Sequence, residues 1–312
     1  MAHRDLKSTA VAAFLGKQSV NMILTVLNIS APVFILAAIG FTWVKLGFEY
    51  RVEFVTRLTM TLSVPCLIFV ALMKTDIDPE SLAALSLAAV AAYFIVMAAF
   101  FALIKIAKLE MRTYLNPLVF GNTGNLGLPL ALFAFGEVGF GYAVVVFAVM
   151  AIMSFTIGIW FVSGGGSLKR VVQEPLVGAT LLGALFLWQG WQTPLVITNT
   201  IELIGQMAIP VMLITLGVAV ARLETKAMTQ AVWLSAVKVV ICVAAAWGAS
   251  VWFGLDEIAA AVLIVQIATP VAVTSYLLAE KYGADAQPVA GLVVASTVLS
   301  VIYLPLILAF VI

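Results

Sequence analysis

The chain has 312 residues, of which 64% are hydrophobic and only 10% are charged, whereas soluble domains carry about 25% charged residues. Its 16 basic and 15 acidic residues give a formal net charge of +1, which excludes the broad positive field of a nucleic-acid-binding protein. This composition is typical of a polytopic membrane protein, so partners are expected in the lipid bilayer or inside the fold.

Residues with reactive or metal-binding side chains are few. Cys66 and Cys242 lie in apolar stretches without metal-ligand spacing, and we interpret them as small buried hydrophobic residues. The single histidine, His3, lies in the N-terminal tail. No nucleophile, base and orienting group converge in the apolar stretches. The sequence therefore predicts no metal, no cofactor and no enzymatic activity.

An N-terminal extension, residues 1–21, contains an apolar run that is too short to span the bilayer. Ten apolar stretches of about 20 residues follow it. Each is predicted to cross the bilayer, which gives an all-α polytopic membrane protein with ten transmembrane helices. The predicted spans are 22–47, 52–74, 80–107, 111–136, 138–163, 174–191, 197–222, 227–253, 256–281 and 286–312.

The distribution of lysine and arginine predicts the orientation, because cytoplasmic loops carry the excess of these residues. Loops after odd-numbered spans, with their flanks, hold eleven of them, and the other side holds four. We therefore expect a multi-pass protein of the cell (inner) membrane with both termini on the non-cytoplasmic side. The Gly-rich segment 164–173 is expected to be a cytoplasmic linker, because it contains Lys169 and Arg170.

Prolines and glycines recur between the two halves in the same order, which predicts an internal repeat. Each half, residues 22–163 and 174–312, holds five spans. An odd number of spans gives the halves opposite polarity in the membrane, an inverted repeat typical of secondary transporters. The matched residues are Pro32, Gly40 and Gly47 with Pro175, Gly183 and Gly190, all 143 positions apart, Pro65 with Pro210, and Gly136 with Gly283.

The fourth span contains a stretch that cannot form a regular helix. Freed backbone groups at membrane depth are tolerated only where protein or a water-filled cavity satisfies them, so the stretch predicts a binding site near the midplane. Helix N-termini there would suit a carboxylate. Its candidate binding residues are Asn122, Thr123, Gly124 and Asn125, and the residues that break the helix are Gly121, Gly127 and Pro129.

The ninth span offers a matching set: Gln266, Thr269, Pro270 and Thr274. Asparagines at such a break can instead satisfy the broken backbone or a neighbouring helix, and threonine hydroxyls can bond to their own helix. A structural role is therefore the alternative for the polar residues of both spans.

Lys238 lies near the centre of span eight, where a charge costs about 2.5–3.5 kcal/mol on insertion scales. We interpret it as a counter-charge to an anionic substrate or as a group whose protonation changes during transport. The alternative is that its side chain extends to the membrane interface. Lys226, at that end, is twelve positions away, about 18 Å of helix, which is farther than the side chain comfortably reaches.

Three motifs together resemble the auxin efflux carrier family of secondary transporters, over residues 22–312: Gly121-Asn122-Thr123 with Gly127-Leu128-Pro129-Leu130, Ala268-Thr269-Pro270, and Ser296-Thr297 with Leu304-Pro305-Leu306. The resemblance implies a scaffold of spans one, two, six and seven, and a transport part of the other spans. Spans four and nine would cross at their breaks and hold the substrate. Plant members have proline where this chain has Gly121, which predicts a looser break here.

The first functional hypothesis is a secondary transporter that moves a small organic anion, a mono- or dicarboxylate, by alternating access. A membrane sensor that binds a ligand at the same crossing without moving it is the second. A sodium-coupled bile-acid-type symporter is the third, although span nine has no acidic residue near Gln266. Coupling to a proton, coupling to a sodium ion and transport without a coupling ion are all compatible with the sequence. A homodimer formed through the scaffold helices is compatible with it as well.

Overall fold

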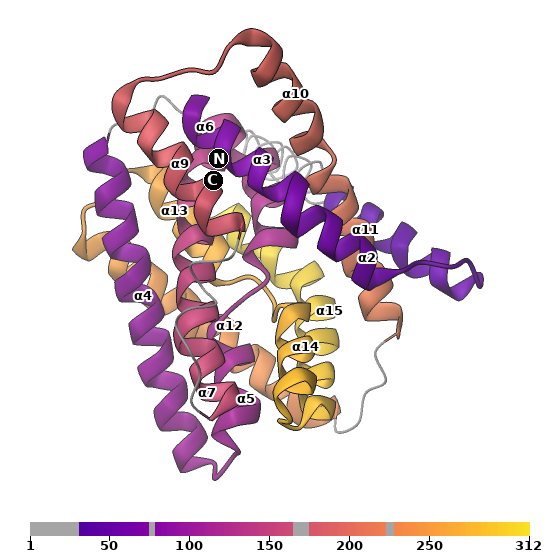
Figure 1. Cartoon of the computed structure of the whole chain (residues 1–312). Coiled ribbons are helices and arrows are strands. Elements are labelled where there is room, and N and C mark those ends of the chain that lie inside the picture. The colour runs from indigo at the N-terminus through magenta and orange to yellow at the C-terminus, as the bar shows by residue number, and fades with distance from the viewer. Residues whose placement is uncertain (1–30, 75–78, 165–174, 223–227) are drawn as a thin grey trace, which may run out of the picture.

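The computed structural model describes residues 31–74, 79–164, 175–222 and 228–312, and within these ranges every regular element is a helix (Figure 1). The predicted N-terminal extension and nearly all of the predicted linker 164–173 lie outside the described residues. Six helical stretches in the described part are long and apolar enough to cross a membrane: Val52–Lys74, Glu80–Ile106, Thr123–Ser163, Leu195–Arg222, Met228–Trp252 and Ala286–Val311.

Most helices lie within the predicted spans, and several spans consist of two or three pieces. The predicted boundary between spans four and five falls inside α6, where only Gly136 departs from helical backbone angles. A first helix covers Ala31–Lys45. It is followed by α2 (Val52–Leu58), η1 (Thr59–Ser63), α3 (Val64–Lys74), α4 (Pro79–Ile106), α5 (Met111–Val119), η2 (Thr123–Gly127), α6 (Leu128–Met153), η3 (Ser154–Gly158), α7 (Ile159–Ser163), α9 (Pro175–Gln189), α10 (Leu195–Gln206), α11 (Ala208–Arg222), α12 (Met228–Trp252), α13 (Glu257–Ile267), α14 (Val273–Tyr282) and α15 (Ala286–Val311).

Three of these elements, η1, η2 and η3, are π-helical turns. Such turns contain one residue more than an α-helical turn and are frequent at functional sites. The first lies in the middle of predicted span two, the second in span four and the third in span five.

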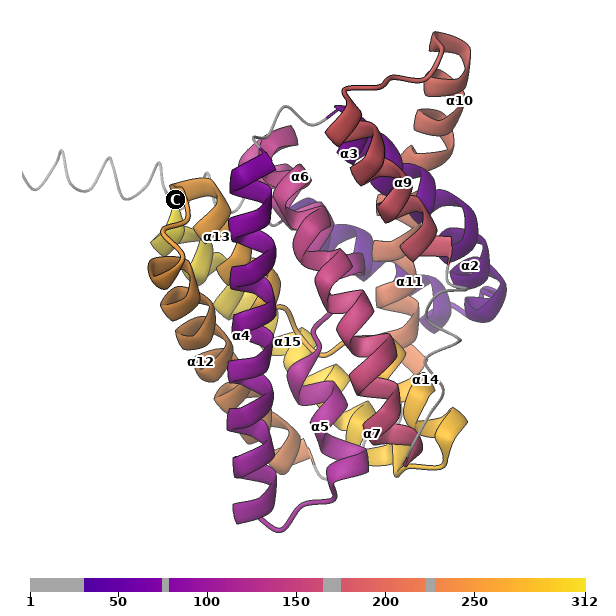
Figure 2. The ribbon, with the colours of Figure 1, turned by 60° about the vertical axis from the view of Figure 1, so that its left-hand side comes forward.

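The helices form two groups that lie side by side (Figure 2). In the α3 group, the first helix, α2, η1, α3, α9, α10 and α11 pack together. In the α12 group, α12 packs against α4, α13 and α15, and α5 packs against α4, α7, α14 and α15. The interrupted spans four and nine both belong to the α12 group, and η2 and α6 also contact the α3 group.

The glycines that the sequence matched in pairs have matching roles. Gly40 approaches the backbone of α11 at Ile214, and Gly183 approaches α3 at Leu72, so a side chain at either glycine would press into the neighbouring helix. The other two pairs adopt a backbone conformation that side chains disfavour. Their φ angles are 86° and 63° for Gly47 and Gly190, and 64° and 68° for Gly136 and Gly283.

Arg112, in the first turn of α5, ties three helices together at one end of the α12 group. Its guanidinium donates from Nε to the carbonyl oxygen of Val162 in α7, at 3.1 Å, and from Nη2 to that of Tyr282, the last residue of α14, at 2.9 Å. Because the last carbonyls of a helix lack partners within it, Arg112 satisfies acceptors at two helix ends. The short helices around the interruptions are thereby held in one unit.

Candidate binding site at the paired helix interruptions

The first interruption follows from prolines and glycines close together in the chain. The helix α5 contains Pro117 and ends at Val119, after which Phe120 is extended, with φ −98° and ψ 119°. Asn122, with φ −82° and ψ 54°, precedes the π-helical turn η2. The next helix, α6, follows directly from η2 at Leu128 and has Pro129 in its first turn, where proline cannot donate an N–H to the preceding turn.

The second interruption separates α13 from α14 at residues 268–272. Here Thr269 terminates its own helix, because its Oγ1 donates to the carbonyl oxygen of Gln266 at 2.7 Å. Pro270 follows, and it cannot continue a helix from this point. The hydroxyl proton of Thr269 is therefore already engaged, in the structural role that the sequence left as an alternative.

The two interruptions lie against each other. The backbone N–H of Asn122 donates to the carbonyl oxygen of Pro270 at 2.7 Å, and Gly121 pairs with Val271 in an isolated antiparallel bridge. The backbone N–H of Val271 in turn donates to Ser296 Oγ of α15, at 2.9 Å. Backbone groups that the breaks release are thus satisfied by each other and by α15.

Gly121 is essential to this close approach, and the predicted looser break is wrong at this position. A Cβ atom at residue 121 would overlap both Oγ1 and the carbonyl oxygen of Thr269. A proline, which carries a Cβ, could not occupy the site without separating the two segments. Gly127 is less constrained, because a Cβ there would overlap only the side-chain amide of Gln266, which can move.

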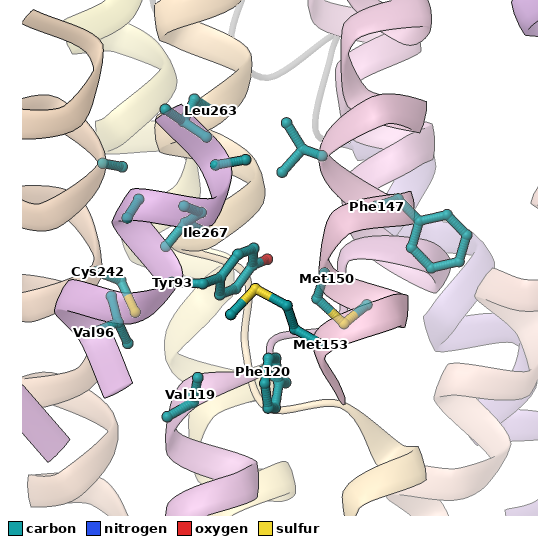
Figure 3. Packing of buried hydrophobic residues seen from close by; sticks show 14 of the residues in the cluster. Tyr93, Val96, Val119, Phe120, Phe147, Met150, Met153, Cys242, Leu263 and Ile267 are labelled. Atoms are coloured by element: carbon teal, nitrogen blue, oxygen red, sulfur yellow. The ribbon is translucent and has the colours of Figure 1, made fainter. Parts of the chain in front are cut away.

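Aromatic and aliphatic side chains support both interruptions from the side of α4 (Figure 3). Tyr93 of α4 lies between Ile267, the last residue of α13, and Phe120, the residue after α5. The rings of Tyr93 and Phe120 are 5.8 Å apart between centroids. All three residues are almost completely buried, so the polar segments rest on a packed apolar layer.

Several polar atoms at the interruptions are buried and have no hydrogen-bond partner within the described part of the chain. They are Asn122 Nδ2, Thr123 Oγ1 and both amide atoms of Gln266, in residues that are 4%, 0% and 0% exposed. An unsatisfied buried group costs about 1–3 kcal/mol. Buried polar groups are normally paired, so this cluster on two touching segments leaves donors and acceptors to which a water molecule or a ligand can bind.

A small cavity of about 30 Å³ adjoins the interruptions. Asn125, whose Oδ1 has no partner in the described residues, and Thr274 line it from the α12 group. The opposite wall is formed by the α3 group, and its polar residues are Thr56, Thr59 and Thr215. Such a volume holds only one or two water molecules, so the cavity in this structure is too small for an organic ligand.

Lys238 is 2% exposed in the middle of α12, and its Nζ donates to Cys242 Sγ at 3.6 Å. Within the described residues no salt bridge involves Lys238, and it does not line the 30 Å³ cavity. The structure thus confines Lys238 to the interior of the α12 group, whereas the candidates of spans four and nine gather at the interruptions.

The wall from the α3 group was not predicted from the sequence. Thr56 and Thr59 stand three residues apart on one helical stretch, so they share a face, and this spacing is the signal that could have indicated them. Asn116 was also missed as a contact residue: its Nδ2 donates to Ser275 Oγ of α14 at 3.3 Å, one turn before the first interruption.

Known proteins to which this chain is similar are named or described as transport proteins. The model of a family described as membrane transport protein matches residues 25–170 and 162–308. An uncharacterized transporter of Methanothermobacter thermautotrophicus (strain Delta H) is 29% identical over 192 residues, which are 59% of this chain and 63% of that protein, less than two thirds of its length. A protein of Rhizobium meliloti (strain 1021), named as a proposed malonate transporter, is 22% identical over 260 residues, 77% of this chain and 81% of that one.

Proposed function

The chain belongs to the auxin efflux carrier-like family of membrane transport proteins, and we propose that it is a secondary transporter that moves a small mono- or dicarboxylate by alternating access. The observation that carries this proposal is the cluster of buried, unpartnered polar atoms on Asn122, Thr123 and Gln266. The name of the Rhizobium meliloti relative makes malonate the first compound to test.

We propose that the architecture is a ten-helix inverted repeat of five plus five helices, residues 22–163 and 174–312, joined by the segment 164–173. The α3 group would be the scaffold and the α12 group the transport part. The paired glycines support this proposal, since Gly40 and Gly183 approach neighbouring helices and the other two pairs have positive φ angles. Spans four and nine would be the crossing helices.

The chemistry of the interruptions suits a carboxylate. Amide N–H groups of Asn122 and Gln266 donate hydrogen bonds, and the Thr123 hydroxyl can donate one more. The helices that restart after each interruption direct their first N–H groups and the positive end of the helix dipole toward the same region. The proposed substrate-contacting set is Asn122, Thr123, Gly124, Asn125, Gln266, Thr269, Pro270 and Thr274, with Lys238 as a more distant counter-charge. Of these, Thr269 can offer its side-chain oxygen only as an acceptor, because its hydroxyl proton is bonded to Gln266.

The polytopic fold and the family place the protein in a membrane. We propose the cell (inner) membrane, with both termini on the non-cytoplasmic side, because the basic loops favour that orientation. The dependence of malonate transport on a pH gradient or a sodium gradient identifies any ion whose movement is coupled to transport.

Transport by the purified full-length chain in proteoliposomes tests the proposal. We expect saturable exchange of radiolabelled malonate, measured with and without a sodium gradient and a pH gradient, and a thermal shift of the solubilised protein with the same compound. A sensor would show the thermal shift without any flux. Absence of both signals for malonate, short monocarboxylates and indole acids would refute an organic-anion transporter.

Replacing Lys238 by methionine should weaken malonate binding about tenfold, because a buried positive charge attracts an anion about 10–15 Å away by about 1–2 kcal/mol at an effective dielectric constant of about 20. Methionine keeps an unbranched chain in the 2% exposed position, so folding should be retained. Isothermal titration calorimetry measures the affinity, and Lys105→Met, at an exposed lysine in α4, is the matched control. An affinity equal to that of the wild type would assign Lys238 a purely structural role beside Cys242.

A further inference from the structure

A cavity of about 590 Å³, the large cavity, lies where the end of α3 and α10 face α6. This volume is within the range of about 300–1,000 Å³ that is common for sites of small organic molecules. Leu67 and Val70 of α3 and Val138 and Phe140 of α6 form apolar walls. The large cavity can therefore hold a small carboxylate, unlike the cavity of about 30 Å³ beside the interruptions.

Three charged side chains line the large cavity, and their charges do not cancel. Lys74 and Glu202 form a salt bridge within the α3 group. Glu137, on α6, is exposed and has no ion pair or hydrogen bond within the described residues. One ammonium group against two carboxylates leaves one surplus negative charge. Because a hollow with surplus charge of one sign focuses its field, negative ions are repelled from this cavity.

The interior of the α12 group offers one positive charge to balance a substrate. Among the described residues, Lys238 is the only charged side chain that is almost completely buried. The unpartnered donors of Asn122 and Gln266 at the interruptions belong to neutral amides. Lys238 can therefore balance one negative charge on a substrate. A second charge would stay uncompensated in a buried site, which is strongly unfavourable.

We propose that the protein selects carboxylates with a single negative charge, and that Glu137 determines this specificity by repelling dianions from the large cavity. This inference rests on the proposed function and narrows it, from a mono- or dicarboxylate to a monocarboxylate or a dicarboxylate with one protonated carboxyl group. The apolar walls act in the same direction, because they can cover the uncharged end of a monoanion but would remove water from a second carboxylate.

Charged thiol reagents test the sign of the field without any carboxylate. The full-length chain with Ala71→Cys, at a lining residue, and Cys66→Ala is placed in nanodiscs, and Cys242 is retained because it is 0% exposed. Methanethiosulfonates that bear a trimethylammonium or a sulfonate group are compared, each relative to its rate with a free thiol in solution. We expect the cationic reagent to react about tenfold faster at low ionic strength, because a unit charge about 8 Å away in a hydrated cavity changes a local ion concentration about threefold and the reagents differ by two charges.

Variants of the lining charges identify the residue responsible. Glu137→Gln should make the two rates nearly equal, because it removes the surplus charge and keeps the shape of the side chain. Lys74→Gln should widen the ratio to about hundredfold, since Glu202 then loses the ammonium group that neutralises it. Glu257→Gln is the matched control, at an exposed glutamate in the first turn of α13 that does not line the cavity, and it should keep the tenfold ratio.

Malonate and monomethyl malonate test the selection on a transported compound. In mildly alkaline solution malonate is a dianion and its monomethyl ester is a monoanion, although the two share one carbon skeleton. We expect kcat/KM for uptake into proteoliposomes to be about tenfold higher for the ester. Glu137→Gln should reduce this preference about threefold, the effect of one unit charge on two ions that differ by one charge.

Three outcomes would overturn the inference. The surplus negative charge is refuted if the two reagents react equally fast with the Ala71→Cys variant, and the role of Glu137 is refuted if Glu137→Gln leaves their ratio unchanged. Preferred uptake of malonate over its monomethyl ester would refute selection of monoanions. The reagents contain no carboxylate, so a tenfold ratio that depends on Glu137, together with no flux of any carboxylate, would refute the proposed function and leave the charge of the cavity established.

Discussion

Replacing Asn122 by alanine should abolish malonate transport while the protein remains folded. The substitution removes Nδ2, which has no partner among the described residues, so no internal hydrogen bond is lost from that atom. The contact with Pro270 persists, because it uses the backbone N–H of Asn122. Stability should therefore stay level or rise slightly, whereas a ligand would lose a donor in a site shielded from water.

Uptake and thermal unfolding measured on the same preparation check this prediction. We expect uptake below about 1% of wild type, since losing a hydrogen bond to a charged ligand and leaving its partner unpaired costs about 3 kcal/mol. Asn199→Ala, at an exposed asparagine of α10, is the matched control and should transport normally. Wild-type uptake by Asn122→Ala would remove the paired interruptions as the site.

Gly121→Ala should disrupt both folding stability and transport. The added methyl group would overlap Oγ1 and the carbonyl oxygen of Thr269, and the backbone of the second interruption cannot rotate away as a flexible side chain could. Overpacking of this kind costs about 1–3 kcal/mol. The expected result is a lower unfolding temperature together with loss of malonate binding, because the two segments are pushed apart.

A glycine with open space around it provides the comparison for this variant. Gly248 lies in α12, and a Cβ there would meet nothing within 4 Å. Gly248→Ala should therefore stabilise the helix by up to about 1 kcal/mol and leave transport intact. If Gly121→Ala unfolds at the same temperature as wild type and binds malonate normally, the close packing of the interruptions is not required for stability or for binding.

Local sequence features predicted the limits of several helices and the position of both interruptions, although α6 runs across the predicted boundary of spans four and five. Long apolar stretches are required by the thickness of the bilayer, and this is why α12 and α15 begin and end within one residue of their predicted spans. Prolines and glycines act on their own backbone, so the breaks around Gly121 and Pro270 could be located without any tertiary information. Gly47 and Gly190, and Gly136 and Gly283, were paired only as signs of a repeat, and the positive φ angles that they share were not predicted.

Features that depend on distant contacts could not be derived in this way. Thr269 and Gln266 are both polar residues of span nine, yet the threonine hydroxyl bonds to its own helix and the Gln266 amide has no partner among the described residues. Which of the two is available for a ligand depends on neighbours far away in the chain, such as Gly127. For the same reason the tight fit of Gly121 against Thr269 was mistaken for looseness.

The bond between Asn122 and Pro270 has a practical consequence, because it runs from main chain to main chain. Exchange of the side chain at position 122 for any residue except proline leaves the N–H donor in place. The hydrogen bond that holds the two interruptions together therefore does not depend on the side chain at position 122, which is the side chain proposed to contact the substrate. Substitution of Asn122 by serine, aspartate or histidine should therefore change the substrate specificity without changing the fold.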